Sequence, residues 1–237
     1  MQYYFIYSAG GGGGEWNGIK RIWKKDMPER LKKNILLKFG DIFFNHKTSK
    51  NIVRTERCEN IDNVRLWLYD NVCDEYVINK SNILLDSGTS KLVNYIEHNY
   101  NVGNLDTNKL IYYFKKEIDE NNIIQKYVDV IIKSKINLAV SFDLPDPFKV
   151  RSNNKASKSR RNIIEEEKTD ELMKVSLEYT NQIFKELKNK MGTKNAINIF
   201  MPVIYGKWSK KQYDMFMNKL EFKPKNIAVG RSFRKKL

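Results

Sequence analysis

Two aspartates each follow an apolar run of the kind that forms a buried strand. The run INLAVSFD ends in Asp143, and the run ILLD ends in Asp86. Enzymes built on parallel α/β sheets place their chemistry at the carboxyl ends of the strands. A carboxylate in this position can relay a proton or accept N–H donors from a ligand. Asp86 and Asp143 are therefore the first candidates for functional residues.

The residues after Asp86 predict how its side chain is exposed. Ser87 and Gly88 form a tight turn above the strand end, and Thr89 or Ser90 is placed to cap a following helix. Asp-Ser-Gly is also common turn chemistry, so the tripeptide alone is a weak signal. Its position after an apolar strand is what makes it informative.

Two further apolar segments repeat the arrangement of a buried strand with a distinct end. The segment 197–206, INIFMPVIYG, ends in Tyr205 and Gly206, and the segment NIAVG ends in Gly230.

The strands that carry these residues alternate with helical segments along the chain. Strands are expected at 3–7, at 34–44 either whole or broken at Gly40, and at 83–86, 136–142, 197–206 and 226–230, and a long helix is expected over 164–190. Such alternation implies parallel pairing. We expect one α/β domain over 1–237, a (β/α)8 TIM-type barrel that is slightly short, or open at its C-terminal side, because a complete barrel takes about 250 residues. The chain has no GxGxxG fingerprint, which argues against a dinucleotide-binding sheet.

The charge of the chain favours a polyanionic partner. Its formal net charge is +15, which indicates nucleic acid ahead of an anionic membrane, although a lysine-rich coding bias would give the same total. Part of this charge lies in 149–163, which is expected to be a mobile loop with six Lys or Arg and no acid. Its candidate contacts to a nucleic-acid backbone are Arg151, Lys155, Lys158, Arg160 and Arg161. The alternative is a solvated linker.

Several classes of protein are disfavoured by the same sequence. The two cysteines, Cys58 and Cys73, and the two histidines, His46 and His98, have no zinc-ligand spacing, so no metal is expected. Unpatterned cysteines, the lack of a signal peptide and the lack of a membrane-length apolar run predict a cytoplasmic protein.

A glycine-rich stretch near the start has two interpretations. An expected strand, the glycine run SAGGGGG and an expected helix follow one another here. This is the layout of a phosphate-binding loop, in which backbone N–H groups face an anion. The stretch does not match GxxxxGK[ST], so we favour a permissive turn over nucleotide binding.

In their order along the chain, these segments resemble those of the tRNA-guanine transglycosylase family. ILLDSGT is similar to the family's DSG strand end, and SFDLPDP is similar to its FDE–P segment. INIFMPVIYG resembles the FGIVQGG strand, and NIAVG resembles the GYAIGG strand. Order and spacing agree from about residue 83 to 231. The glycine-rich start looks like that of the divergent phage-type branch, which places 7-deazaguanines in DNA.

The resemblance implies base exchange at an N-glycosidic bond, with guanine replaced by a 7-deazaguanine in DNA or tRNA. Asp86 inherits the catalytic role of the DSG aspartate, which contacts the base and takes part in proton transfer. By the same resemblance, Asp143 would recognise the edge of the heterocycle. The remaining base-binding positions are Ser87, Tyr205, Gly206 and Gly230.

The chain departs from the family pattern at four points. Tyr205 replaces the base-reading Gln, and Arg231 stands where the family has a second glycine. The nucleophilic aspartate and the zinc cluster of the family have no counterpart in the 237 residues, so no cofactor is expected. Asp146 is no better supported as a substitute nucleophile than any turn aspartate. The resemblance thus implies either a truncated or split member, with a second subunit or a homo-oligomer completing the site, or a member that has lost base exchange.

Two other functions stay open on the sequence. A non-catalytic nucleic-acid-binding subunit would keep the fold and the basic loop but would bind independently of both aspartates. An unrelated barrel enzyme would use the glycine loop for a small phosphate ligand and would have no affinity for polynucleotides.

Overall fold

A parallel sheet forms the centre of the protein. The computed structural model describes residues 5–6, 23, 26–49, 52–57, 63–100, 102, 106–144, 166–205 and 208–230. The sheet contains β1 (Phe5–Ile6), β2 (Asn34–Lys38), β5 (Asn82–Asp86), β6 (Leu138–Val140) and β7 (Phe200–Met201). Neighbouring strands pair parallel, and their order in the sheet is their order in the sequence. A doubly wound sheet would reverse its strand order, so this topology differs from that of dinucleotide-binding folds.

The sheet continues past Pro202 into a second parallel pair. β8 (Val203–Tyr205) follows β7 directly and pairs with β9 (Ala228–Gly230). Ala228 donates its N–H to the carbonyl of Pro202 at 2.9 Å, and Val203 donates its N–H to the Ser141 hydroxyl at 3.0 Å. Proline lacks an N–H, so the hydrogen bonds between the strands are interrupted here. The hydroxyl of Ser141 accepts the N–H of Val203 instead of a main-chain carbonyl. The run of strands in sequence order therefore extends to β9.

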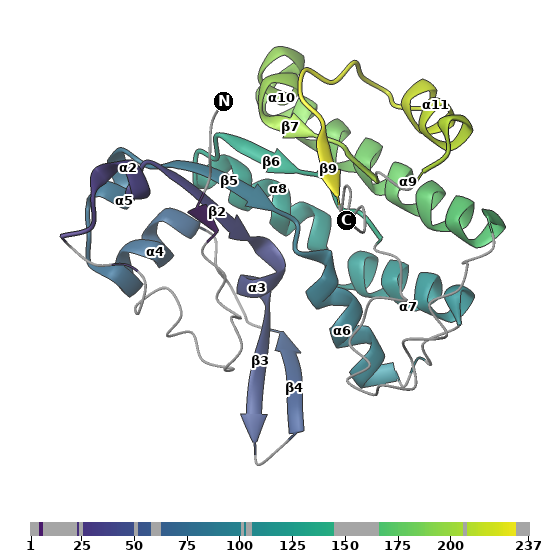
Figure 1. Ribbon diagram of the computed structural model, residues 1–237, viewed down its shortest axis with the longest axis horizontal. Coiled ribbons are helices and arrows are strands. Elements are labelled where there is room, and N and C mark those ends of the chain that lie inside the picture. The colour runs from purple at the N-terminus through teal and green to yellow at the C-terminus, as the bar shows by residue number, and fades with distance from the viewer. Residues whose placement is uncertain are drawn as a thin grey trace, which may run out of the picture.

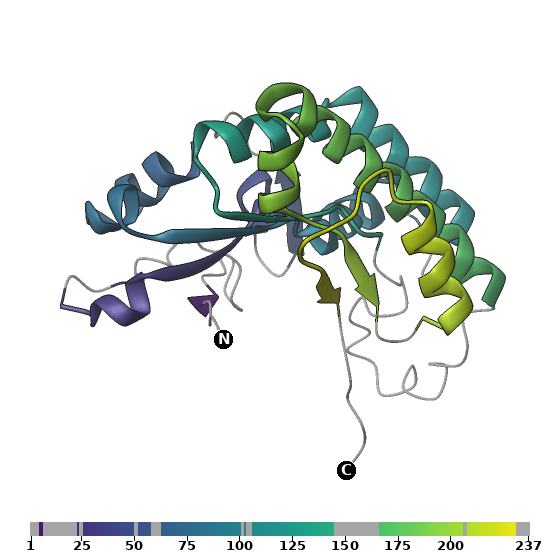
Figure 2. The ribbon, with the colours of Figure 1, turned by 90° about the horizontal axis from the view of Figure 1, so that it is seen from above.

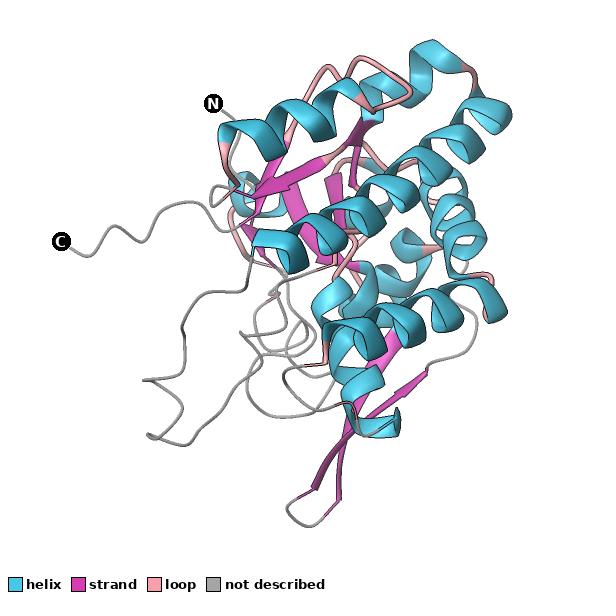
Figure 3. Cartoon of the chain, turned by 90° about the vertical axis from the view of Figure 1, so that its right-hand side faces the viewer, coloured by secondary structure: helices cyan, strands magenta, loops and turns pink. Residues whose placement is uncertain are grey.

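Helices cover one face of this sheet (Figures 1, 2 and 3). The longer ones are α4 (Val64–Val72), α6 (Thr89–Tyr100), α7 (Thr107–Glu120), α8 (Ile123–Lys133), α9 (Glu166–Met191) and α11 (Lys210–Asn218), and the shorter ones are α2 (Glu29–Lys32), α3 (Phe39–Phe43), α5 (Tyr76–Asn79) and α10 (Thr193–Ile199). Figure 2 shows α8, α9 and α10 arched over the strands. Within the described ranges, no helix has the length and apolar character needed to cross a membrane.

Alternating side chains give the two faces of the sheet different roles. Ile83 and Leu85 of β5 are fully buried in the main core with the helices. Leu84 packs instead into a smaller cluster with Val140 and Met201 on the other face. Because side chains alternate along a strand, Asp86 at the end of β5 shares the face of Leu84. The candidate site thus lies on the face away from the main helical core.

The structure corrects two of the predicted strands. The segment 34–44 is not one strand: β2 ends at Lys38, α3 follows, and β3 (Phe44–Ser49) pairs antiparallel with β4 (Ile52–Arg57) in a hairpin that projects in Figure 1. The five residues of α3 are all buried, so tertiary packing overrides the strand-like composition. The segment 197–206 is helical in α10 as far as Ile199, and only 200–205 is extended, with the break at Pro202. The predicted long helix is confirmed as α9.

One arginine organises the edge of the sheet where the strands begin. Arg65 of α4 donates to the carbonyls of Ser134 at 2.7 Å, Ser81 at 2.8 Å, Val77 at 2.9 Å and Lys135 at 3.2 Å. These carbonyls lie just before β5 and β6. Arg65 therefore joins the entrances of two neighbouring strands through hydrogen bonds between its guanidinium and the main chain.

Candidate functional site

A glycine contact fixes the turn that presents Asp86. Gly88 has a φ of 63°, which disfavours any residue with a side chain. Gly40 donates its N–H to the Ser87 carbonyl at 3.0 Å, and a Cβ on Gly40 would lie 2.1 Å from the Gly88 carbonyl oxygen. The N–H of Gly88 in turn lies 3.5 Å from Oδ1 of Asp86. The turn is therefore held against the start of α3 by two residues that lack side chains.

Asp143 lies beside this turn and accepts three hydroxyl donors. Its Oδ1 accepts from Thr89 at 3.0 Å and from Ser87 at 3.4 Å. Its Oδ2 accepts a short hydrogen bond from the Tyr205 hydroxyl. The next residue, Leu144, donates its N–H to Ser176 of α9 at 2.9 Å, which anchors the segment after β6. Three separate chain segments thus meet at one carboxylate.

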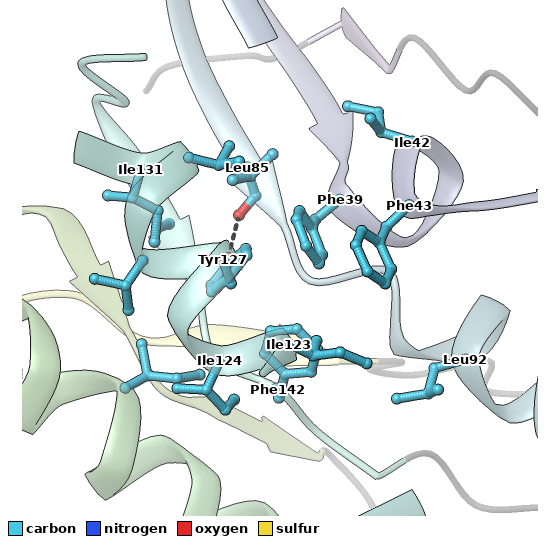
Figure 4. Close-up of a cluster of buried hydrophobic side chains, with 14 of the residues drawn as sticks. Phe39, Ile42, Phe43, Leu85, Leu92, Ile123, Ile124, Tyr127, Ile131 and Phe142 are labelled. Atoms are coloured by element: carbon cyan, nitrogen blue, oxygen red, sulfur yellow. Dashed lines mark hydrogen bonds between the residues drawn. The ribbon is translucent and has the colours of Figure 1, made fainter. Parts of the chain in front are cut away.

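A buried tyrosine, Tyr127, lies next to Leu85 at the end of β5 (Figure 4). The Tyr127 hydroxyl donates to the carbonyl of Val140 at 2.6 Å, and the carbonyl of Leu85 lies 3.1 Å away. The Tyr127 ring packs edge-on against Phe39 and Phe142, with centroids 5.1 and 4.9 Å apart. This hydroxyl links the ends of β5 and β6 where their side chains must be aligned.

The two carboxyl groups differ in what acts on them. Burial raises the pKa of Asp86, and the charge of Asp143 raises it further, while Lys38 opposes the rise. Burial also raises the pKa of Asp143, but hydrogen bonds from Tyr205, Thr89 and Ser87 oppose this rise by stabilising the ionised form. Two neighbouring carboxyl groups share protons unequally when their surroundings differ. The two carboxyl groups therefore differ in their surroundings: Asp86 faces a like charge, whereas Asp143 accepts hydroxyl donors.

The absence of a side chain at Gly230 leaves room for the Tyr205 ring. The two residues are paired in register between β8 and β9. A Cβ on Gly230 would lie 3.1 Å from Cε1 of Tyr205 and 3.2 Å from Val203. Gly230 thus contributes to the site by admitting the neighbouring ring.

The structure brings most of the predicted site residues together and leaves others undescribed. Asp86, Ser87, Asp143, Tyr205 and Gly230 gather at the carboxyl ends of β5, β6, β8 and β9. Gly206, the basic loop 149–163 and the glycine loop 8–14 lie outside the described residues.

Three further residues at the site were missed by the sequence interpretation. Lys38 is paired in register with Asp86 across β2 and β5, but the prediction of a strand running to residue 44 concealed its position at a strand end. Thr89 was interpreted as a helix cap, whereas its hydroxyl donates to Asp143. Tyr127 is one of several apolar positions on α8, and no sequence signal marked it.

No metal site accompanies the carboxylates in the described ranges. There, no three His, Cys, Asp or Glu side chains gather in a way that could hold an ion. The site offers two carboxyl groups with raised pKa values, a phenol and a lysine. In comparisons with protein-family models, curated proteins and solved structures, the chain matches none of them.

Proposed function

We propose that this protein is a base-exchange transglycosylase that replaces guanine with a 7-deazaguanine in DNA or tRNA. The observation that carries the proposal is the pairing of Asp86 with Asp143 at the ends of adjacent parallel strands, with unequal surroundings. The resemblance of the DSG and SFD segments to the tRNA-guanine transglycosylase family motivated the choice of reaction. In that family the two aspartates have separate roles, and here their environments differ: Asp86 faces the charge of Asp143, while Asp143 accepts hydroxyl donors.

The chemistry of base exchange matches the two carboxyl groups. A purine leaves its sugar more readily when a general acid protonates it, and burial and the charge of Asp143 raise the pKa of Asp86, which favours that role. A carboxylate has about four acceptor positions. Three hydroxyls and its own main-chain N–H donate to Asp143, so an N–H from a guanine-like edge would take the place of one of these donors.

Strand order supports a barrel wall as the scaffold for this site. Parallel strands in sequence order with helices on one face are the arrangement of (β/α)8 barrels, in which strand ends carry the catalytic groups. We propose that β1, β2 and β5 to β9 form part of such a wall. The target nucleotide would leave its stack to reach the strand ends.

The net charge of +15 supports a nucleic acid as the substrate. Lys and Arg in 149–163 would contact phosphates and contribute affinity that falls with salt, independently of base sequence.

The test is incorporation of labelled guanine, and of a labelled 7-deazaguanine, into DNA and into tRNA by the purified protein. Asp86→Asn and Asp143→Asn are expected to lose incorporation, and Asp214→Asn, at an exposed position on α11, serves as the matched control. Binding of the same nucleic acids is measured in parallel over a salt series. Tight, salt-sensitive binding without incorporation by the wild type, and without dependence on either aspartate, would reject base exchange in favour of a binding subunit.

A further inference from the structure

A base-exchange enzyme with a covalent intermediate needs a nucleophile, and the hydrogen bonds of the site restrict which side chain can serve. The hydroxyls that donate to Asp143 belong to Ser87, Thr89 and Tyr205. Ser87 and Thr89 are only 1% and 4% exposed, so neither can reach the anomeric carbon of a bound nucleotide. Tyr205 is partly exposed and lies at the last position of β8.

We propose that Tyr205 is the nucleophile of the proposed exchange and that Asp143 is its general base; this inference rests on the proposed function. Nucleophile, base and orienting group follow the arrangement of known triads: the Tyr205 hydroxyl donates to Asp143, and Thr89 holds the other oxygen of Asp143. Tyrosine nucleophiles are known in some glycoside hydrolases.

The order of the strands places the acid and the nucleophile on opposite sides of the base-reading carboxylate. Asp86 ends β5 and Tyr205 ends β8, while Asp143 follows β6, the strand between them. Adjacent strands lie about 4.8 Å apart, so the flanking strand ends are separated by about 10 Å. Displacement at C1′ requires the attacking oxygen on the side opposite the leaving base.

The first half of the reaction balances on these three side chains. The Tyr205 oxygen forms a bond to C1′ as the C1′–N bond to the base breaks. The base takes the bonding electron pair and receives the proton of Asp86. The phenolic proton passes to Oδ2 of Asp143, and Oδ1 keeps its hydrogen bonds from Thr89 and Ser87. Burial raises the pKa of Asp143, which narrows the difference in acidity between the carboxyl group and the phenol.

The second half restores every group. The incoming base attacks C1′ through its nitrogen and loses its proton to the Asp86 carboxylate. The bond between C1′ and Tyr205 breaks, and the phenolic oxygen regains its proton from Asp143. Two displacements return the sugar to its original configuration, and no further reactant is needed.

The test combines exchange assays with localisation of the covalent intermediate. Tyr205→Phe is expected to lose exchange by at least about 10³-fold, while Tyr213→Phe, at a surface position of α11, retains it. An aryl glycoside survives denaturation, so acid quenching during turnover on a labelled oligonucleotide should leave a labelled protein. Trypsin then separates Tyr205 in 195–207 from Asp143 and Asp146 in 136–149, and from Asp86 in 81–91. The label is expected on 195–207.

The outcomes distinguish failure of the tyrosine nucleophile from failure of the proposed function. Exchange by the wild type with label on 136–149 or 81–91, or exchange that Tyr205→Phe preserves, overturns the tyrosine nucleophile and leaves the proposed function standing. No exchange by the wild type on DNA or tRNA overturns the proposed function and this inference with it. Thermal unfolding and oligonucleotide binding of Tyr205→Phe show whether a loss of exchange reflects loss of fold.

Discussion

The two edges of the parallel sheet both hold buried ionisable groups, but these groups have different partners. At the edge where the strands begin, burial lowers the pKa of Arg65, and its guanidinium donates to the main-chain carbonyls of five residues. At the edge where the strands end, Asp86 faces another carboxylate, and both pKa values are raised by burial. A charge surrounded by dipoles of the right sign stabilises the fold. A carboxyl group beside a second one costs stability, and its altered protonation is available for chemistry.

The comparison teaches that stability and reactivity are divided between the ends of the same strands. Both β5 and β6 enter the sheet beside the Arg65 guanidinium and leave it at the carboxylate pair. Substitution of Arg65 should therefore change stability alone, and substitution of the Asp86 carboxyl group should change the proposed exchange with little effect on stability. The predictions below test this separation.

The largest effect is expected from Asp86→Asn. Loss of the proton donor should lower exchange by about 10³-fold, the middle of the range for general acids. Its effect on stability should be small or favourable. Because the pKa of Asp86 is raised in the folded state, the wild type loses stability as pH rises above the unfolded pKa, and asparagine removes that loss. Exchange assays and thermal melts at several pH values measure both; a strongly destabilised variant would contradict the separation.

At the opposite edge, Arg65→Leu should reduce stability without changing the chemistry. The carbonyls of Ser81, Ser134 and Val77 lose a charged donor, and we expect a loss of about 3 kcal/mol in the free energy of unfolding. Urea denaturation measures this loss, and Arg30→Leu, at an exposed position of α2, is the control. Exchange per folded molecule should stay within about two-fold of wild type; a large fall would show that the edges are coupled.

Two glycines with positive φ allow the energetic cost of backbone strain to be measured separately from the cost of steric crowding. Gly88 and Gly192 both have positive φ, but a Cβ on Gly88 would lie 2.7 Å from the Gly40 nitrogen, whereas a Cβ on Gly192 has nothing within 4 Å. Gly192→Ala should cost about 1 kcal/mol, and Gly88→Ala about 2 kcal/mol more. Chemical denaturation gives both values. Equal costs would mean that the Asp86 turn can move away from α3.

The smallest effect concerns a carboxyl group away from both edges. Burial raises the pKa of Glu97 on α6 to about 7. The folded protein therefore binds this proton more tightly than the unfolded chain, and the stability it contributes is lost as pH rises from about 4.5 through 7. Glu97→Gln should be more stable than wild type at pH 8, by no more than about 1 kcal/mol, because the side chain is half exposed. Exchange should be unchanged; a loss would show that this group acts in the site.

The sequence predicted the strand ends of the site better than the segments between them. Asp86 and Asp143 follow nearly continuous runs of apolar residues, and such runs directly reflect burial of a strand in the sheet. Lys38 was missed because Phe39, Ile42 and Phe43 have the composition of a strand, while their burial in α3 depends on contacts far along the chain. Tyr127 was missed for the same reason: its carbonyl partners come from two strands that only the folded chain brings together.

The contact between Gly40 and Gly88 limits how the sequence of this protein can diverge. Neither position admits a larger residue while the other is unchanged, because each backbone occupies the space of the missing side chain. Descendants of this chain should hence retain a small residue at both places even where the surrounding residues differ beyond detection. A search that requires two such residues, one shortly after the second strand and one directly after an aspartate-serine strand end, would recover distant relatives that overall similarity overlooks.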